Sequence, residues 1–333
     1  MTRERRLELR EEIREMFIHS YDGYMRHAFP GGELLPLSCG SGELHLVKVP
    51  LVTLVDSLDA LAIMGNATEF RRAVRLVSDG LDVEADADVS VFESNIRILG
   101  GLLSAHLLAT NPDLGLYRSH GGGGRCVGDN GNGVRFSDRG GNAAGERSVG
   151  GYGQDRESDE KGGFRGLDDD WSEEIGHRAE EGEGESGEEQ YDGELLVLAE
   201  RLGRRLLPAF KTPTGSLGGC DVTQLSGIPY GTVNLKRGVP KGETTISSLA
   251  GAGSLTVEFS VLSALTGDGV FAEAAEGAVK ALFDRRSAAL GLLGKHIDSK
   301  TGVWTETQSS IGTNGDSFYE YLLKMYVLWG DVG

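Results

Sequence analysis

The sequence predicts an all-α fold interrupted by a long insertion, and three observations support this. Apolar side chains recur at three- and four-residue steps along most of the chain, which is the spacing of one helix face. Runs with the pattern of a strand are few and short. Many of the 51 glycines among the 333 residues cluster between Gly121 and Gly187, which separates that tract from the helical part.

The helical spacing is clear near the start, where Ile13, Phe17, Tyr21 and Tyr24 fall on one face. The same pattern predicts helices over 7–29, 52–65, 68–81, 90–109, 193–207, 246–265, 270–286 and 315–329. About eight helices joined by loops indicate an all-α architecture. An α-solenoid is the alternative, but the chain has no self-similar period of the kind that such arrays display.

Local signals mark where several of these helices begin and end. Ser90 is placed to cap its helix, and Asp316 begins the last helix after a glycine. The run Thr266-Gly267-Asp268 separates two helices. Short strand patterns over 231–235 and 293–297 suit hairpins between helices.

Two segments lack the composition of a folded core. Residues 118–190 are rich in Gly, Ser, Asp and Glu and have very few aliphatic side chains, so they bury too little surface to offset the entropy of ordering. We predict that they form a disordered insertion. A smaller insertion is predicted over 216–226, and inserted loops and translated intron sequence both fit this composition. The helical part is then divided into 1–117 and 191–333.

The net charge of -18 and the pI near 4.8 disfavour nucleic acid and anionic lipid as partners, because a polyanion would be repelled. Neutral ligands such as sugars remain compatible. Part of the acidic excess lies in runs such as Asp168-Asp169-Asp170 within the predicted insertion. The charge therefore excludes some partners without locating a site.

Cysteines and the amino-terminal segment say little about compartment. Cys39, Cys126 and Cys220 have no metal-ligand spacing, and three is an odd number for a disulfide framework. The start of the chain is charged and has no apolar segment of the kind that a secretory signal contains. No eighteen apolar residues follow one another, so membrane association is compatible with the chain but is not encoded in it.

Glu93 and Arg97 are the first candidate site residues. They stand four residues apart and share one face of a helix that is otherwise apolar. An ordinary exposed ion pair is the simple explanation. Because the helix is apolar nearly all round, we expect it to be buried, and a buried carboxylate with one cation beside it often marks a site.

Asp316 and Glu320 repeat this spacing with two acids, and Tyr319 and Tyr321 flank the second. Like charges four residues apart weaken a helix slightly, which suggests a purpose other than stability. The alternative is an acid favoured by the helix dipole followed by an unrelated exposed glutamate. Two acid-bearing helices in one apolar chain favour a shared cavity.

Glu258 is a third candidate, since it lies within another apolar helical run. Asp56 and Asp59 also place acids on a mainly apolar helix, three residues apart, although capping or solvent exposure explains that pair equally well.

Carboxylates that converge beside aromatic rings suit glycoside hydrolysis, in which one acid protonates the leaving oxygen and another activates water or stabilises the transition state. The sequence contains no phosphate-binding loop, metalloprotease His pair or Gly-x-Ser-x-Gly elbow.

Several blocks of the chain, over roughly 250 residues, resemble glycoside hydrolase family 47, the class I α-1,2-mannosidases. They are 53–65 (TLVDSLDALAIMG), 91–103 (VFESNIRILGGLL), 193–210 (GELLVLAERLGRRLLPAF) and 315–324 (GDSFYEYLLK). Within the family, 36–39, 229–234 and 250–253 look more like the branch that enhances degradation in the endoplasmic reticulum.

The resemblance implies an (α/α)7 barrel whose inner helices aim carboxylates at a calcium ion (Ca2+) and at a terminal α-1,2-linked mannose, which is cleaved with inversion. By motif, Glu93 resembles the general acid and Asp316 the carboxylate that acts as base or transition-state stabiliser. Inversion requires about 6.5 to 9.5 Å between acid and base, so that water fits between them. The expected substrate-binding residues are Arg97, Glu258, Glu320 and Asp56.

The chain departs from the family pattern in three respects, of which the first is the lack of a secretory signal. Segment 43–50 stands where the family usually has a Trp-Gly segment before Thr53. The family's later helices, a further catalytic carboxylate and the calcium-ligating threonine are expected beyond residue 333. About the N-terminal half of the barrel is therefore predicted here, with no metal ligand assigned within it. A half-barrel would expose apolar inner faces, which predicts poor solubility for this chain alone.

The resemblance implies the endoplasmic reticulum as the location and high-mannose N-glycans on misfolded glycoproteins as the partners. The first hypothesis is a glycosidase that trims α-1,2-linked mannose in quality control and degradation. A glycan-binding quality-control factor without catalysis, and an inactive fragment of the enzyme, are the alternatives. A helical interaction scaffold is a further hypothesis, for which the acids would be surface features.

Overall fold

The computed structural model describes residues 1–117, 190–215 and 227–330. The predicted insertion over 118–190, except its last residue, and the smaller one over 216–226 lie outside the described residues. The division of the chain around these segments therefore stays a prediction.

Helices make up most of the described chain, as predicted. The longer ones are α1 (Arg3–His27), α2 (Val52–Ile63), α3 (Ala67–Gly80), α5 (Gly100–Ala109), α7 (Glu194–Leu206), α9 (Thr256–Thr266), α10 (Val270–Phe283) and α11 (Asp316–Trp329). Short helices and turns are α4 (Val91–Glu93), η1 (Ser94–Leu99), η2 (Pro112–Leu114), η3 (Leu207–Phe210), η4 (Pro213–Gly215) and α8 (Leu249–Gly253).

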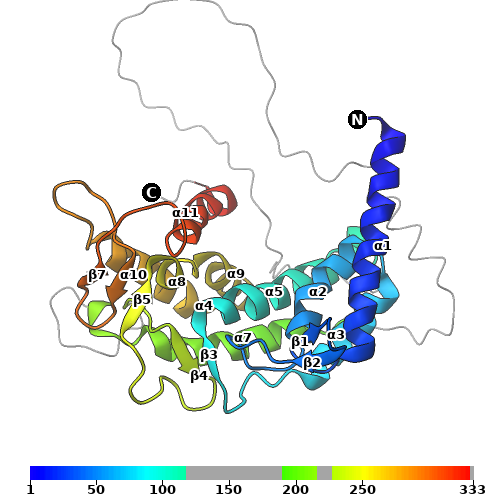
Figure 1. Cartoon of the computed structure of the whole chain (residues 1–333), viewed down its shortest axis with the longest axis horizontal. Coiled ribbons are helices and arrows are strands. Elements are labelled where there is room, and N and C mark those ends of the chain that lie inside the picture. Colours follow the sequence, from blue (N-terminus) through cyan, green and yellow to red (C-terminus); the bar gives the residue numbers. More distant parts are fainter. Residues whose placement is uncertain (118–189, 216–226, 331–333) are drawn as a thin grey trace, which may run out of the picture.

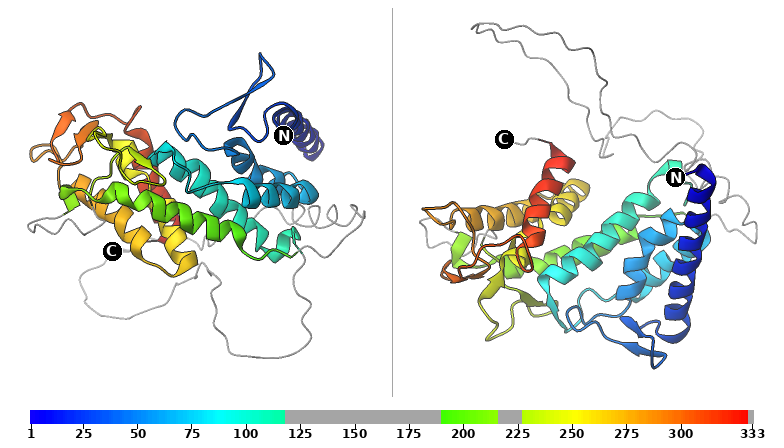
Figure 2. Two further views of the ribbon diagram at one scale, coloured as in Figure 1. Left: turned by 90° about the horizontal axis from the view of Figure 1, so that it is seen from below. Right: turned by 45° about the horizontal axis from the view of Figure 1, so that its top comes forward.

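The helices pack as a connected series (Figure 1). Helix α2 contacts α3 and α5, α5 contacts α7, α7 contacts α9, and α9 contacts α10. Helix α11 packs against α8 and α9, while α1 stands at the other end of the molecule. The two further views in Figure 2 show the same separation of α1 from α11. Segments distant in sequence therefore meet around the centre of this series.

Close helix contacts depend on small residues. A Cβ atom on Gly101 of α5 would lie 2.8 Å from Cγ1 of Val55 on α2, and one on Gly203 of α7 would lie 2.6 Å from Cδ2 of Leu262 on α9. Neither position has room for a side chain. These two glycines set how closely α2, α5, α7 and α9 approach one another.

Seven short strands accompany the helices in the part of the chain that the structure describes. They are β1 (Glu33–Leu35), β2 (Gly40–Gly42), β3 (Asp88–Ser90), β4 (Thr232–Asn234), β5 (Ile246–Ser248), β6 (His296–Asp298) and β7 (Trp304–Glu306). The β1–β2 hairpin was not predicted. The expected strands over 231–235 and 293–297 exist in part, as β4 and β6. Strand β4 pairs with distant β3 rather than forming a local hairpin, and β6 lies between β5 and β7.

One predicted helix was wrong, because 246–265 is not continuous. The stretch begins as strand β5, and the hydroxyl of Ser248 then caps α8 by accepting the N–H of Gly251 at 2.9 Å. Gly253 ends α8 against the ring of Phe318, and α9 starts afresh at Thr256. Glycine-rich sequence and tertiary contacts thus outweighed the helical periodicity.

The segment Leu249–Thr266, which contains α8 and α9, is long and apolar enough to span a membrane by composition. However, 56% of it is buried inside the protein, as core helices often are.

Candidate functional site

The candidate site is built on the segment that follows strand β3. The hydroxyl of Ser90 accepts the N–H of Glu93 at 3.3 Å and caps α4, as predicted. The chain then passes through the π-helical turn η1 before regular helix resumes in α5. π-Helical turns within α-helices are rare and often occur at functional sites. This turn carries both Asn95 and Arg97, whose side chains contact different neighbours.

The first cluster, called the arginine cluster here, consists of Glu93, Arg97 and Asp56. Nε of Arg97 donates to Oε2 of Glu93 at 2.8 Å, and another guanidinium nitrogen donates to Oδ2 of Asp56 at 3.1 Å. The exposed fractions of the side chains are 18% for Glu93, 40% for Arg97 and 35% for Asp56. The ion pair between Glu93 and Arg97 is present, but it is partly exposed rather than buried as expected. Arg97 also reaches a second carboxylate, Asp56 on α2.

Charge compensation explains the electrostatics of this cluster. The hydrogen bond from Arg97 to Glu93, with the nearby charge of Asp56, raises the pKa of the guanidinium above its usual value. Partial burial raises the pKa of the Asp56 carboxyl, while Arg97 acts in the opposite direction. The cluster is therefore an ordered set of two acids around one cation, with part of each side chain accessible to a ligand.

The second cluster, called the tyrosine cluster here, consists of Glu258, Asn95 and Tyr321. Nδ2 of Asn95 donates to Oε2 of Glu258 at 2.7 Å, and the hydroxyl of Tyr321 donates to Oε1 at 2.8 Å. The carboxylate lies beside the start of α5, since a Cβ on Gly100 would be 3.8 Å from its Oε1. Three segments far apart in sequence, η1, α9 and α11, meet at this one side chain.

Burial dominates the electrostatics of the tyrosine cluster. Desolvation raises the pKa of Glu258, and the hydrogen bonds from Tyr321 and Asn95 offset only part of that effect. Burial also raises the pKa of the Tyr321 phenol, and the neighbouring Glu258 carboxylate adds to the shift. Both groups are thus biased towards their neutral forms.

Asp316 and Glu320 lie on α11 but are exposed. Oδ1 of Asp316 accepts the N–H of Ser317 at 3.0 Å, and Glu320 forms an exposed ion pair with Lys324 at 3.7 Å. Within the described residues, no hydrogen bond or ion pair joins either acid to the two clusters. Helix α11 nevertheless reaches the site through Tyr321.

The described residues do not fit a complete metal site. Calcium takes six to eight oxygen ligands, commonly from several carboxylates. No group of three or more His, Cys, Asp or Glu side chains able to hold an ion occurs in the part of the chain that the structure describes. Oδ1 of Asn95 is buried without a hydrogen-bond partner there, but a single amide oxygen does not make a cation site.

Asn95 and the role of Tyr321 were missed by sequence reasoning. Asn95 is fully buried, and a polar side chain two residues after Glu93 on an apolar helix was the available signal. Buried amides need hydrogen-bond partners, so its position called for a partner on another helix. The partner itself, Glu258, lies 163 residues away.

Comparison with known proteins identifies a matching family and several similar proteins. Residues 16–332 match glycosyl hydrolase family 47. The chain is 41% identical over 324 residues to alpha-mannosidase I MNS4 of Arabidopsis thaliana, covering 97% of the chain and 38% of that protein. It is 37% identical over 326 residues to ER degradation-enhancing alpha-mannosidase-like protein 2 of Homo sapiens, covering 97% of the chain and 41% of that protein.

A solved structure, an alpha-1,2-mannosidase from Trichoderma reesei, has a similar fold, with a TM-score of 0.63 and 23% sequence identity. The match covers 96% of this chain and 50% of that one. The chain thus spans about two-fifths of the length of these two relatives and half of the solved structure.

Proposed function

Because the chain belongs to glycosyl hydrolase family 47, we propose that it contributes to an α-mannosidase that removes α-1,2-linked mannose from high-mannose N-glycans. The names of its relatives support a place in glycoprotein quality control and degradation in the endoplasmic reticulum. We further propose that the described helices form part of an (α/α)7 barrel, about its N-terminal half. The similarity to half of a solved mannosidase supports that arrangement.

One observation carries the proposal: η1 joins two carboxylate clusters that draw on α2, α4, α9 and α11. Glycoside hydrolysis needs separate carboxyl groups on the two sides of the scissile bond. Glu93 is proposed as the general acid that protonates the leaving oxygen. Asp316, which belongs to neither cluster, is proposed as the base or transition-state stabiliser because its motif resembles that of the family and its exposure on α11 leaves room for water.

The remaining residues are proposed to bind and orient the sugar. Arg97 holds Glu93 in one orientation and offers further N–H donors to hydroxyl groups. Asp56 fixes the other side of the guanidinium, and Glu258 is held in place by two neutral donors. Glu320 is proposed to contact the sugar from the exposed side of α11. Calcium remains an expectation from the family, and no step here depends on it.

Mannose release from a purified high-mannose N-glycan tests the proposal. The protein that contains this chain should release mannose, and Glu93→Gln should abolish most of the release. Glu276→Gln is a matched control, because Glu276 is exposed on α10 and belongs to neither cluster. Release that is unchanged in Glu93→Gln would overturn the proposed role of this residue. Glycan binding without turnover would point to the non-catalytic alternative.

A further inference from the structure

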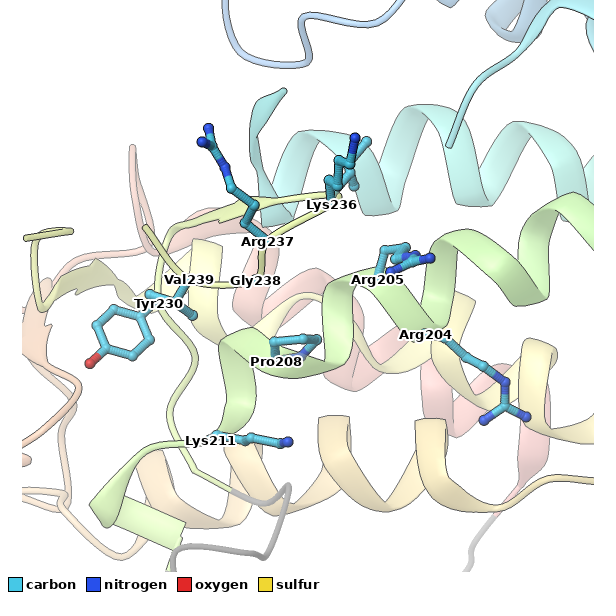
Figure 3. A pocket seen from close by; sticks show the side chains of 10 residues that line it. Arg204, Arg205, Pro208, Lys211, Tyr230, Lys236, Arg237, Gly238 and Val239 are labelled. Atoms are coloured by element: carbon cyan, nitrogen blue, oxygen red, sulfur yellow. The ribbon is translucent and has the colours of Figure 1, made fainter. Parts of the chain in front are cut away.

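A basic pocket, which shares no residue with the two clusters, lies where α7 ends. It has a volume of about 540 Å³ and is bounded by the last turn of α7, the turn η3 and the loop that follows β4 (Figure 3). Pockets of this size accommodate small ligands. The residues on which its chemistry depends are Arg204, Arg205, Lys211, Tyr230, Lys236 and Arg237.

The lining has one sign of charge. Five of the lining residues are lysine or arginine, and none is aspartate or glutamate. This is unexpected in a chain whose net charge is -18. Cationic side chains in a pocket attract anions at short range even when the protein as a whole is acidic.

The three arginines are held in place by acids that do not line the pocket. Arg205 donates to Glu84 at 2.5 Å, and Arg237 forms an ion pair with Asp86 at 2.7 Å. Both acids belong to the loop before β3. The third arginine, Arg204, forms ion pairs with Glu200 and Asp268. These contacts partly neutralise the guanidinium groups but also orient them, and each keeps further N–H donors for a ligand.

The two lysines supply the uncompensated charge. Lys211 follows η3 and Lys236 follows β4, so they come from two different walls of the pocket (Figure 3). Both are exposed, and within the described residues neither forms an ion pair. A lysine ammonium group is a compact charge that serves proteins as a phosphate binder.

We propose that this pocket binds the phosphate group of a small ligand. A phosphate monoester carries roughly -1.5 to -2 charges near neutral pH, which matches two uncompensated ammonium groups better than the single charge of a carboxylate. The arginine N–H groups supply directional donors to its oxygens. A soluble sugar phosphate and a lipid headgroup both carry this group, and both could reach the pocket because it is open to solvent.

Binding of inorganic tripolyphosphate and glucose 6-phosphate to the protein that contains this chain, measured by calorimetry, tests this proposal. Saturable binding that weakens with added salt is expected. The affinity of the double variant Lys211→Gln/Lys236→Gln should be at least ~10-fold lower, because both uncompensated charges are removed. Lys241→Gln is the matched control, an exposed lysine on the same loop that does not line the pocket.

Vesicles that contain a phosphorylated inositol lipid distinguish the two sources of the phosphate. Co-sedimentation that depends on Lys211 and Lys236 would identify a lipid headgroup. Binding of glucose 6-phosphate with no vesicle association would identify a soluble ester. Absence of saturable binding to every probe, or equal affinity in the double variant and the parent chain, would overturn the proposal. Circular dichroism of the variants would show whether they keep the parent fold.

Discussion

The arginine cluster and the tyrosine cluster stabilise a carboxylate on an apolar helix in different ways. Glu93 is the carboxylate of the first and Glu258 that of the second, and each accepts a hydrogen bond from a side chain of η1. Glu93 is balanced by a guanidinium in a partly exposed setting, whereas Glu258 accepts only neutral donors. Burial raises the pKa of Glu258, and the nearby charge of Lys324 offsets only a small part of that effect. Neighbouring positions of one turn thus produce one compensated acid and one that is costly to ionise.

The largest difference between the clusters should be seen in catalysis. If Glu93 is the general acid, Glu93→Gln should lower kcat for mannose release by ~100- to 10,000-fold, the usual contribution of general acid catalysis. Kinetics of mannose release with saturating glycan would measure it. An equal loss in Arg97→Met, with Glu93 intact, would instead assign the effect to orientation of the cluster.

The tyrosine cluster should dominate stability. Tyr321→Phe removes the donor to Oε1 of Glu258 and leaves that oxygen without its partner. Leaving a buried acceptor without its partner costs about 1–3 kcal/mol, so the free energy of unfolding should fall by that amount at neutral pH. Urea unfolding would measure it. The exposed Tyr326→Phe on the same helix provides the control and should change little.

The pH dependence of stability should separate the clusters further. Because the pKa of Glu258 is raised in the folded protein, the folded state binds the proton more tightly than the unfolded state. Stability should therefore rise as pH falls from above the folded pKa towards the usual pKa of glutamate. A tenfold difference in proton affinity between the two states corresponds to ~1.4 kcal/mol. Urea unfolding between neutral and mildly acidic pH should show this gain in the parent.

In Glu258→Gln, the free energy of unfolding should no longer rise as pH falls. A glutamine can accept from Asn95 and donate to the oxygen of Tyr321, so the variant should be at least as stable as the parent at neutral pH. An identical pH slope in parent and variant would contradict the assignment of this titration to Glu258.

The smallest effect is expected at the rim of the arginine cluster. Asp56→Asn removes one charge from a pair whose members are 35% and 40% exposed. Exposed ion pairs typically contribute less than about 1 kcal/mol, so the free energy of unfolding should change by no more than that. Added salt should reduce even this difference. A loss of several kcal/mol would mean that Arg97 is far less hydrated than its exposure indicates.

Local sequence rules predicted those parts of the site that depend on neighbours along one helix. Ser90 caps its helix, and Glu93 and Arg97 pair across one turn, because both interactions need only helical spacing. The same spacing called attention to Asp316 and Glu320. Their proposed roles remain predictions, since each makes only local contacts in the described structure.

The sequence by itself determined the helical character, most helix positions and the acids that could carry the chemistry, because periodicity and capping are local properties. Only the tertiary structure decided that Asn95 and Tyr321 would hold Glu258, that Arg97 would reach Asp56, and that 246–265 would break into a strand and two helices. Those outcomes depend on packing between segments far apart in the chain. Helical periodicity shows which side of a helix is buried, but it does not specify which helix will cover it.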